Sequence, residues 1–140
     1  MDFYMLNFKL AIPLTVRIAD INYGNHVGHQ NFFLYFQEAR VAYLKQFGHS
    51  ELDIHGYGII LAAAECSYKQ ALFMGDEIMV GCRISELKTK LFIMEYQIER
   101  ADILCATGST KILCYDYRSK KVTPWPAEFI ATIKHYEEMP

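Results

Sequence analysis

Residues 20–40 read DINYGNHVGHQNFFLYFQEAR and combine a polar loop with the first turns of an apolar helix. The loop, from Asp20 to Asn31, is dense in Asp, Asn, Gly and His, which favour turns and helix starts. From Gln30 to Phe47 apolar side chains recur at helical spacing, and Gly48 ends a helix of about five turns. These apolar positions are Phe32, Phe33, Phe36, Ala39, Val41, Tyr43, Leu44 and Phe47. Because the apolar stripe is broad, we expect a sheet to wrap around the helix.

The rest of the chain has the pattern of strands. Apolar residues alternate with others from Phe8 to Ile18, which predicts a strand with one buried face, and Pro13 favours an edge or a bulge. Later runs are joined by short connections, so we expect them to be antiparallel neighbours. The runs are Ile59 to Lys69, Glu77 to Leu87, Leu91 to Arg100 and Leu104 to Tyr115, and Ala127 to Glu138 is compatible with a short helix. The order β-α-β-β-β-β predicts a single α+β domain over residues 1–140.

Composition narrows the classes of partner. Hydrophobic residues make up 52% of the chain and aromatic residues 14%, so we expect a partner subunit or an apolar ligand to cover some apolar surface. An edge strand at Ile59 to Tyr68 is where we expect a second copy to pair. The net charge is −2, from 14 basic and 16 acidic residues, and no stretch concentrates basic residues. This argues against a nucleic-acid partner.

The sequence also bears on the compartment. No run approaches the roughly 20 apolar residues of a membrane span, and no export signal is evident. The cysteines form no CxxC pair and lie in strand-like runs, which indicates reduced, buried thiols; they are Cys66, Cys82, Cys105 and Cys114. We therefore expect a cytoplasmic protein.

The polar loop supplies the candidate catalytic residues. His26 carries an imidazole that titrates near neutral pH and can take a proton from water without a metal. Asp20 and Asn22 stand in the same loop, although both residue types also serve as ordinary turn residues. Backbone N–H groups at the helix start, at about Val27 and Gly28, are expected to lack partners and to stabilise an oxyanion. The loop is therefore a candidate acyl-transfer site.

The loop and helix resemble the signature of hotdog-fold thioesterases of the 4-hydroxybenzoyl-CoA type. That signature is an acidic loop, a Gly/His/Val element and an aromatic-rich helix ending in Glu-Ala-Arg, here Glu38-Ala39-Arg40. The resemblance covers nearly the whole chain, including Tyr68, Gly75-Asp76 and Ala106-Thr107-Gly108. It implies an antiparallel five-stranded sheet wrapped around one long helix, thioester hydrolysis, no metal or organic cofactor, and homodimers or homotetramers.

One position departs from that family. Many members have Asp-x-Asp in the loop, with the second aspartate as base or nucleophile, and Asn22 occupies its place here. An amide cannot take a proton at neutral pH. The trio of Asp20, Asn22 and His26 is instead similar to the Asp-x-Asn…His arrangement of plant fatty acyl-carrier-protein thioesterases, with two extra residues before His26. The resemblance implies a fatty-acyl thioester of CoA or acyl-carrier protein and a role in fatty acid metabolism.

Other residues extend the candidate site. His29 forms a His-x-x-His pair with His26, but no third metal ligand is evident, so we expect no metal and place His29 at the thioester entrance. Glu65 interrupts a small apolar run and could reach a partner's active loop, although strand alternation alone places it in solvent. An acyl pocket is expected among the helix aromatics Phe32, Phe33 and Phe36. Coenzyme A phosphates are expected to favour basic turns, first Lys88 and Lys90, and otherwise Lys111, Arg118, Lys120 and Lys121.

Two other functions remain open at this point. Hotdog acyl-CoA hydratases or dehydratases also use Asp-x-Asn…His, but with Pro after Asn and a shorter gap to His, whereas Tyr23 follows Asn22 here. A non-catalytic acyl-CoA-binding protein is the other alternative, because Asn22 replaces the usual aspartate and a fold does not guarantee activity. Release of a free thiol as a product distinguishes hydrolysis from both of these alternatives.

Overall fold

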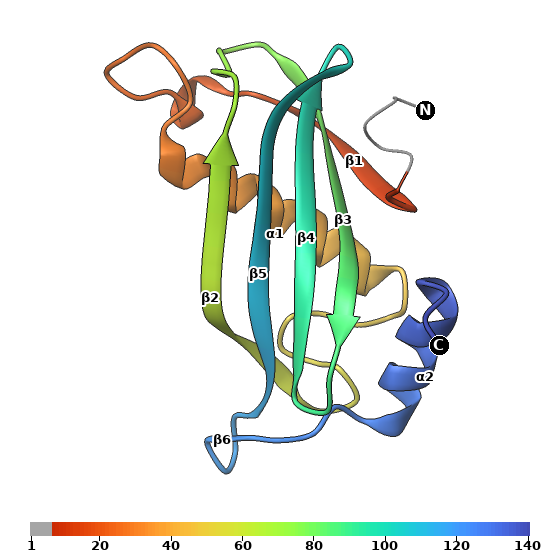
Figure 1. The fold of residues 1–140 in the computed structure, drawn as a ribbon. Coiled ribbons are helices and arrows are strands. Elements are labelled where there is room, and N and C mark those ends of the chain that lie inside the picture. Colours follow the sequence, from red (N-terminus) through yellow and green to blue (C-terminus); the bar gives the residue numbers. More distant parts are fainter. Residues whose placement is uncertain (1–6) are drawn as a thin grey trace.

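In the computed structural model, which describes residues 7–140, one antiparallel sheet crosses a long helix (Figure 1). Its strand order is β1-β3-β4-β5-β2, with β6 beside β5. The predicted order of elements and the hotdog arrangement are confirmed. The elements are β1 (Leu10–Thr15), the 3-10 helix η2 (Ile18–Asp20), α1 (His29–Lys45), β2 (Gly58–Tyr68), β3 (Glu77–Leu87), β4 (Leu91–Arg100), β5 (Ile103–Asp116), β6 (Lys121–Val122) and α2 (Ala127–Tyr136).

Alternation places one face of the central strands in the core. The bounds of β3 and β4 are those predicted, and their alternate residues are buried on the sheet face that carries α1, where Phe92 stacks on Trp125 and contacts Phe129 of α2. This buried set is Ile78, Val80, Cys82, Ile84, Phe92, Met94, Tyr96 and Ile98. The core therefore lies between the sheet and the helix, as expected for a sheet with one apolar face.

β1 is shorter than predicted. Within residues 7–140 it pairs only with β3 and places Pro13 on an edge strand, which confirms the edge position. The strand ends at Thr15, and the predicted last residue, Ile18, is 71% exposed in η2. The reason is local, because the Asp20 carboxylate accepts a hydrogen bond from the Arg17 N–H at 3.0 Å and turns the chain out of the sheet.

α1 lies across the sheet within one or two residues of the predicted bounds. Phe36 is fully buried and stacks on Tyr96 of β4, with ring centroids 4.5 Å apart. A Cβ on Gly108 of β5 would overlap the Phe36 ring, so glycine lets the sheet approach the helix. Val41 was expected in the buried stripe but is 43% exposed, because it shares the outward face of the helix with Leu34.

A buried arginine ties the helix to its surroundings. Arg40 donates from Nε to Glu51 at 2.7 Å and from Nη1 to the Tyr96 hydroxyl at 2.9 Å. The Tyr96 hydroxyl in turn lies 2.7 Å from Thr110 Oγ1. A buried charge with these partners keeps its hydrogen bonds, so the helix, the loop after it and two strands are held in one arrangement.

The edge strand β2 is unlike the inner strands. It pairs with β5 alone, and most of its residues from Ile60 to Tyr68 are exposed. All four cysteines are free thiols, and Cys66 of β2 is the partly exposed one. Among residues 7–140, no helix is long and apolar enough to cross a membrane.

Candidate active site

The loop before α1 forms a miniature hairpin. Ile21 and Val27 make an antiparallel bridge, and the Asn22 N–H donates to the His26 carbonyl at 2.9 Å. At its tip Asn25 adopts a φ of 65°, a left-handed conformation that asparagine tolerates. The Asn22 side chain accepts the Gly24 N–H through Oδ1 at 2.8 Å. Asn22 is therefore a turn residue that also stands directly across from His26.

His26 presents one ring nitrogen for proton transfer. Its Nδ1 lies 3.2 Å from the Val27 carbonyl oxygen, and a carbonyl only accepts, so Nδ1 carries the proton. In the neutral imidazole this leaves Nε2 unprotonated. A Cβ built on Gly24 would lie 3.0 Å from His26 Nε2 and 3.2 Å from Asn22 Oδ1. The two side chains thus face the same space, as the sequence predicted.

Asn22 and His26 also line a cavity of about 340 Å³ between the loop, the first turn of α1 and the end of β2. Tyr68, the last residue of β2, meets Phe32 of α1 edge to face, with ring centroids 4.9 Å apart. None of the lining side chains is acidic; they are Asn22, His26, Val27, His29, Phe32, Tyr68, Lys69, Gln70 and Ala71. The cavity combines an imidazole, an amide and an aromatic wall, which suits a polar carbonyl group that carries an apolar substituent.

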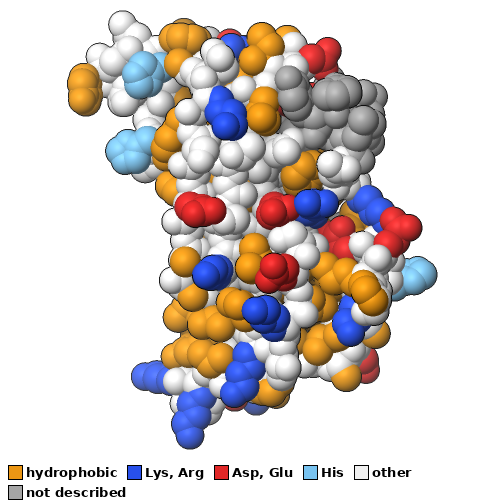
Figure 2. Space-filling view, viewed as in Figure 1, with side chains coloured by type: hydrophobic (Ala, Val, Ile, Leu, Met, Phe, Trp, Pro, Cys, Tyr) orange, Lys and Arg blue, Asp and Glu red, His pale blue; other side chains and the backbone are white. Residues whose placement is uncertain are grey.

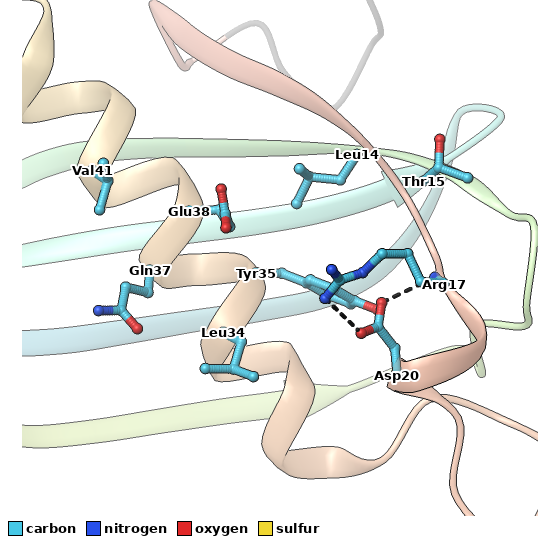
Figure 3. A pocket seen from close by; sticks show the side chains of 9 residues that line it. All are labelled: Leu14, Thr15, Arg17, Asp20, Leu34, Tyr35, Gln37, Glu38 and Val41. Atoms are coloured by element: carbon cyan, nitrogen blue, oxygen red, sulfur yellow. Dashed lines mark hydrogen bonds and ion pairs between the residues drawn. The ribbon is translucent and has the colours of Figure 1, made fainter.

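Asp20 does not face this cavity (Figure 3). Its carboxylate lies in a second hollow of about 470 Å³ on the other side of the helix start and accepts hydrogen bonds from Arg17 and from the Tyr35 hydroxyl at 2.8 Å. Burial opposes its ionisation, but hydrogen bonds from the Arg17 backbone, Tyr35 and the Arg17 guanidinium outweigh it and hold the pKa of Asp20 below its ordinary value. Burial and the Asp20 carboxylate raise the pKa of Tyr35, so its hydroxyl remains a donor.

The backbone of Asp20 is what reaches the site. Its carbonyl accepts the Gly28 N–H at 3.2 Å and the Asn31 side-chain amide at 2.8 Å. Asp20 therefore fixes the start of α1 from outside the cavity. Asn31, Tyr35 and Arg17 contribute by donating the hydrogen bonds that Asp20 accepts. These three residues were not predicted from the sequence, because a side chain near a helix start gives no sign of such a distant partner.

The expected oxyanion donors are wrong. The Val27 N–H donates to the Leu72 carbonyl at 2.8 Å and the Gly28 N–H to the Asp20 carbonyl at 3.2 Å, so both are already used. His29 and Gln30 are the first residues of α1, and N–H groups there have no carbonyl one turn earlier to accept them. The free N–H groups at the positive end of the helix therefore begin at His29, which lines the cavity, and not at Val27.

Two of the predicted acyl-pocket residues lie elsewhere. Phe32 lines the cavity. Phe36 is fully buried beneath Tyr96, and Phe33 is half-buried and contacts Phe36 edge to face at 5.9 Å. Both therefore stabilise the core and do not line the cavity.

Glu65 and the predicted coenzyme A lysines lie away from the cavity. Glu65 is on the sheet face opposite α1, where it accepts the Ser109 hydroxyl at 3.0 Å among the mixed charges of that face (Figure 2). It cannot reach an active loop on the helix side. Lys88 and Lys90 flank the β3–β4 turn, which β4, a ten-residue strand of roughly 33 Å, separates from the end that bears the cavity. Over residues 7–140, no three His, Cys, Asp or Glu side chains form a metal-binding group.

Known proteins share this sequence pattern and this fold. The sequence model of the thioesterase-like superfamily matches residues 16–133. A putative esterase of Aquifex aeolicus is 33% identical over 110 residues, 77% of this chain and 84% of its own length. The acyl-CoA thioesterase YbgC of Haemophilus influenzae is 24% identical over 134 residues, 94% of this chain and 98% of its own. A thioesterase of Thermus thermophilus, solved with coenzyme A and zinc, superposes with a TM-score of 0.83 at 23% identity, covering 97% of this chain and 99% of that one.

Asp20→Asn tests whether the carboxylate acts in the chemistry. Because it faces away from the cavity, we expect a loss of kcat well short of the roughly 10²-fold that removal of a general base causes. The lowered pKa in the folded state means that the carboxylate stabilises the fold above the unfolded pKa of about 3.9 and that this stabilisation is lost as pH falls further. Urea unfolding should thus give a lower free energy of unfolding for Asp20→Asn than for the native protein at pH 7, and this difference should shrink below about pH 4. A collapse of kcat with normal stability would instead make Asp20 catalytic.

Proposed function

Because the chain belongs to the thioesterase-like superfamily, whose activity is the hydrolysis of acyl-CoA thioesters, we propose that it performs this reaction in the cavity between residues 22–29 and the end of β2. One observation carries the proposal. Asn22, His26 and His29, the first residue of α1, line the same cavity. A candidate base, an orienting amide and the first free N–H group of the helix thus belong to one site.

His26 is the proposed general base. The hydrogen bond from Nδ1 to the Val27 carbonyl fixes the ring and leaves Nε2 to take a proton from water. The water oxygen then bonds to the thioester carbon, and the carbonyl oxygen becomes an oxyanion. When the C–S bond breaks, the thiolate leaves and the His26 imidazolium returns the proton, giving free acid and free thiol. No covalent intermediate with the protein is needed.

Asn22 cannot act as a base, because an amide does not take up a proton at neutral pH. Its Oδ1 is held by the Gly24 N–H, which leaves its amide N–H₂ to orient the water or the substrate carbonyl. The N–H groups of His29 and Gln30 are the proposed oxyanion donors, since those of Val27 and Gly28 are already bonded. The acyl group is placed against Phe32 and Tyr68.

A second copy completes the proposed binding site. β2 has one unpaired edge, and two copies that pair there in antiparallel fashion would extend the sheet as a homodimer. Such pairing brings the start of one β2 beside the end of the other, so the β5–β6 turn of the second copy comes to the cavity. That turn carries Arg118, Lys120 and Lys121, and several Lys and Arg side chains gather at the lower left of Figure 2, where Figure 1 draws β6. Guanidinium and ammonium groups suit the coenzyme A phosphates. We also propose that pairs of dimers form homotetramers, that the protein is cytoplasmic and that its substrate is a fatty-acyl thioester.

His26→Ala is expected to lower kcat by roughly 10²-fold or more, with a smaller effect on KM, because it removes the base. Asn22→Ala should also lose rate, whereas Asn22→Asp should keep or raise it by supplying a carboxylate. Thiol release from acyl-CoA measures all four enzymes.

His29→Ala is the matched control for the base, since this imidazole borders the same cavity and its proposed contribution is a backbone N–H that alanine retains. Its kcat should stay close to native. If His29→Ala loses the larger factor and His26→Ala stays active with its fold intact, the two roles must be exchanged.

The triple variant Arg118→Ala, Lys120→Ala, Lys121→Ala tests the phosphate site. We expect KM for acyl-CoA to rise with little change in kcat, and the dependence of KM on salt to weaken, because exposed charges are screened. Lys88→Ala with Lys90→Ala is the control, because the sheet order places the β3–β4 turn further than the β5–β6 turn from β2. If KM rises only in the control, the coenzyme A phosphates bind at the β3–β4 turn, as the sequence first predicted.

A further inference from the structure

We infer that Tyr68 is a positioning residue for the oxyanion donors, a role that rests on the proposed function and adds a residue to it. Tyr68 is the last residue of β2, and its hydroxyl donates to the backbone carbonyl of His29 at 3.1 Å. Through this hydrogen bond, a side chain of the sheet holds the first turn of α1. Its ring meets Phe32 of the same turn edge to face.

The bond acts on the peptide group that joins His29 to Gln30. The carbonyl of His29 and the N–H of Gln30 share that planar, resonance-stabilised unit. A donor on the oxygen draws charge along the unit and makes the N–H a stronger donor, as in other hydrogen-bonded chains. The Tyr68 hydroxyl therefore both orients and polarises the Gln30 N–H, one of the two groups proposed to receive the oxyanion.

The end of β2 is a firm support for this contact. Tyr68 pairs with Ala106 of β5, and the next two residues, Lys69 and Gln70, both donate to the Cys105 carbonyl, at 2.9 and 3.1 Å. On the opposite side of the helix start, the Asp20 carbonyl holds Gly28 and Asn31. The first turn of α1 is thus fixed from both sides, by the loop through Asp20 and by the sheet through Tyr68.

Exposure to solvent determines how much the Tyr68–His29 hydrogen bond contributes to the stability of the fold and how much to kcat. Tyr68 is 47% exposed, so water competes for the bond in the free protein and its contribution to stability is small. A bound acyl group would cover the hydroxyl and exclude water, and an electrostatic contact strengthens when water leaves. The bond therefore matters most while the oxyanion is present, so its loss should appear in kcat.

The test compares two phenylalanine variants. Tyr68→Phe keeps the ring against Phe32 and removes only the hydroxyl. Tyr43→Phe, near the other end of α1 and outside the cavity, removes the bond from the Tyr43 hydroxyl to the Glu137 carboxylate at 2.6 Å. With thiol release as the assay, we expect Tyr68→Phe to lose roughly three- to tenfold in kcat with KM unchanged. Tyr43→Phe should keep kcat, although it loses the more buried bond and should lose at least as much in Tm.

Binding of a non-hydrolysable thioether analogue of acyl-CoA separates the ring from the hydroxyl. It should be unchanged in Tyr68→Phe, because the analogue forms no oxyanion, and weaker in Tyr68→Leu, which loses the aromatic wall. Native kcat in Tyr68→Phe, or an equal loss in both phenylalanine variants, would overturn the role of Tyr68 while leaving hydrolysis intact. Absence of thiol release by the native protein would refute the proposed function, and this role with it.

Discussion

The burial of α1 across the sheet is the constraint on which the site depends. Phe36 stacks on Tyr96 at 4.5 Å, and the absence of a side chain at Gly108 lets this contact form. Because interiors are closely packed, the helix has one position along the sheet, and Arg40 locks it there through Glu51 and Tyr96. The first turn of the helix therefore lies at the end of β2. There the end of the strand, the polar loop before α1 and the positive end of the helix dipole lie together.

The proposed chemistry uses the backbone and side-chain groups that this arrangement leaves without hydrogen bonds. Loop and strand satisfy the N–H groups of Val27 and Gly28, so the free donors begin at His29. Asp20 contributes through its carbonyl and leaves its carboxylate to Arg17 and Tyr35. The cavity therefore contains no carboxylate, and an imidazole is the group in it that can take a proton from water. This is a physical reason why the chain can have asparagine at position 22 where many relatives of the type it resembles have aspartate.

Periodicity predicted most of the fold, because alternation and helical spacing are properties of neighbouring residues. β3 and β4 were bounded correctly. Asp20, Asn22 and His26 were predicted as a trio from their shared loop, and Asn22 and His26 line one cavity whereas the Asp20 carboxylate lies outside it. Other features depend on partners far along the chain. The carbonyl that occupies the Val27 N–H belongs to Leu72, and the hydroxyl that draws away the Asp20 carboxylate belongs to Tyr35. Spacing alone also left the outward side of α1 undecided, so Val41 was assigned to the wrong face.

A single turnover of excess protein on acyl-CoA in H₂¹⁸O, with a chelator present, tests the central claim most directly. The account predicts that each acyl-CoA consumed gives free thiol, and that the label enters the released acid and not the protein, because water attacks the thioester itself. Label found in a carboxylate of the protein would show a covalent intermediate. Acyl-CoA that is consumed without thiol release, or that remains intact across aromatic, short-chain and long-chain substrates, would contradict hydrolysis altogether.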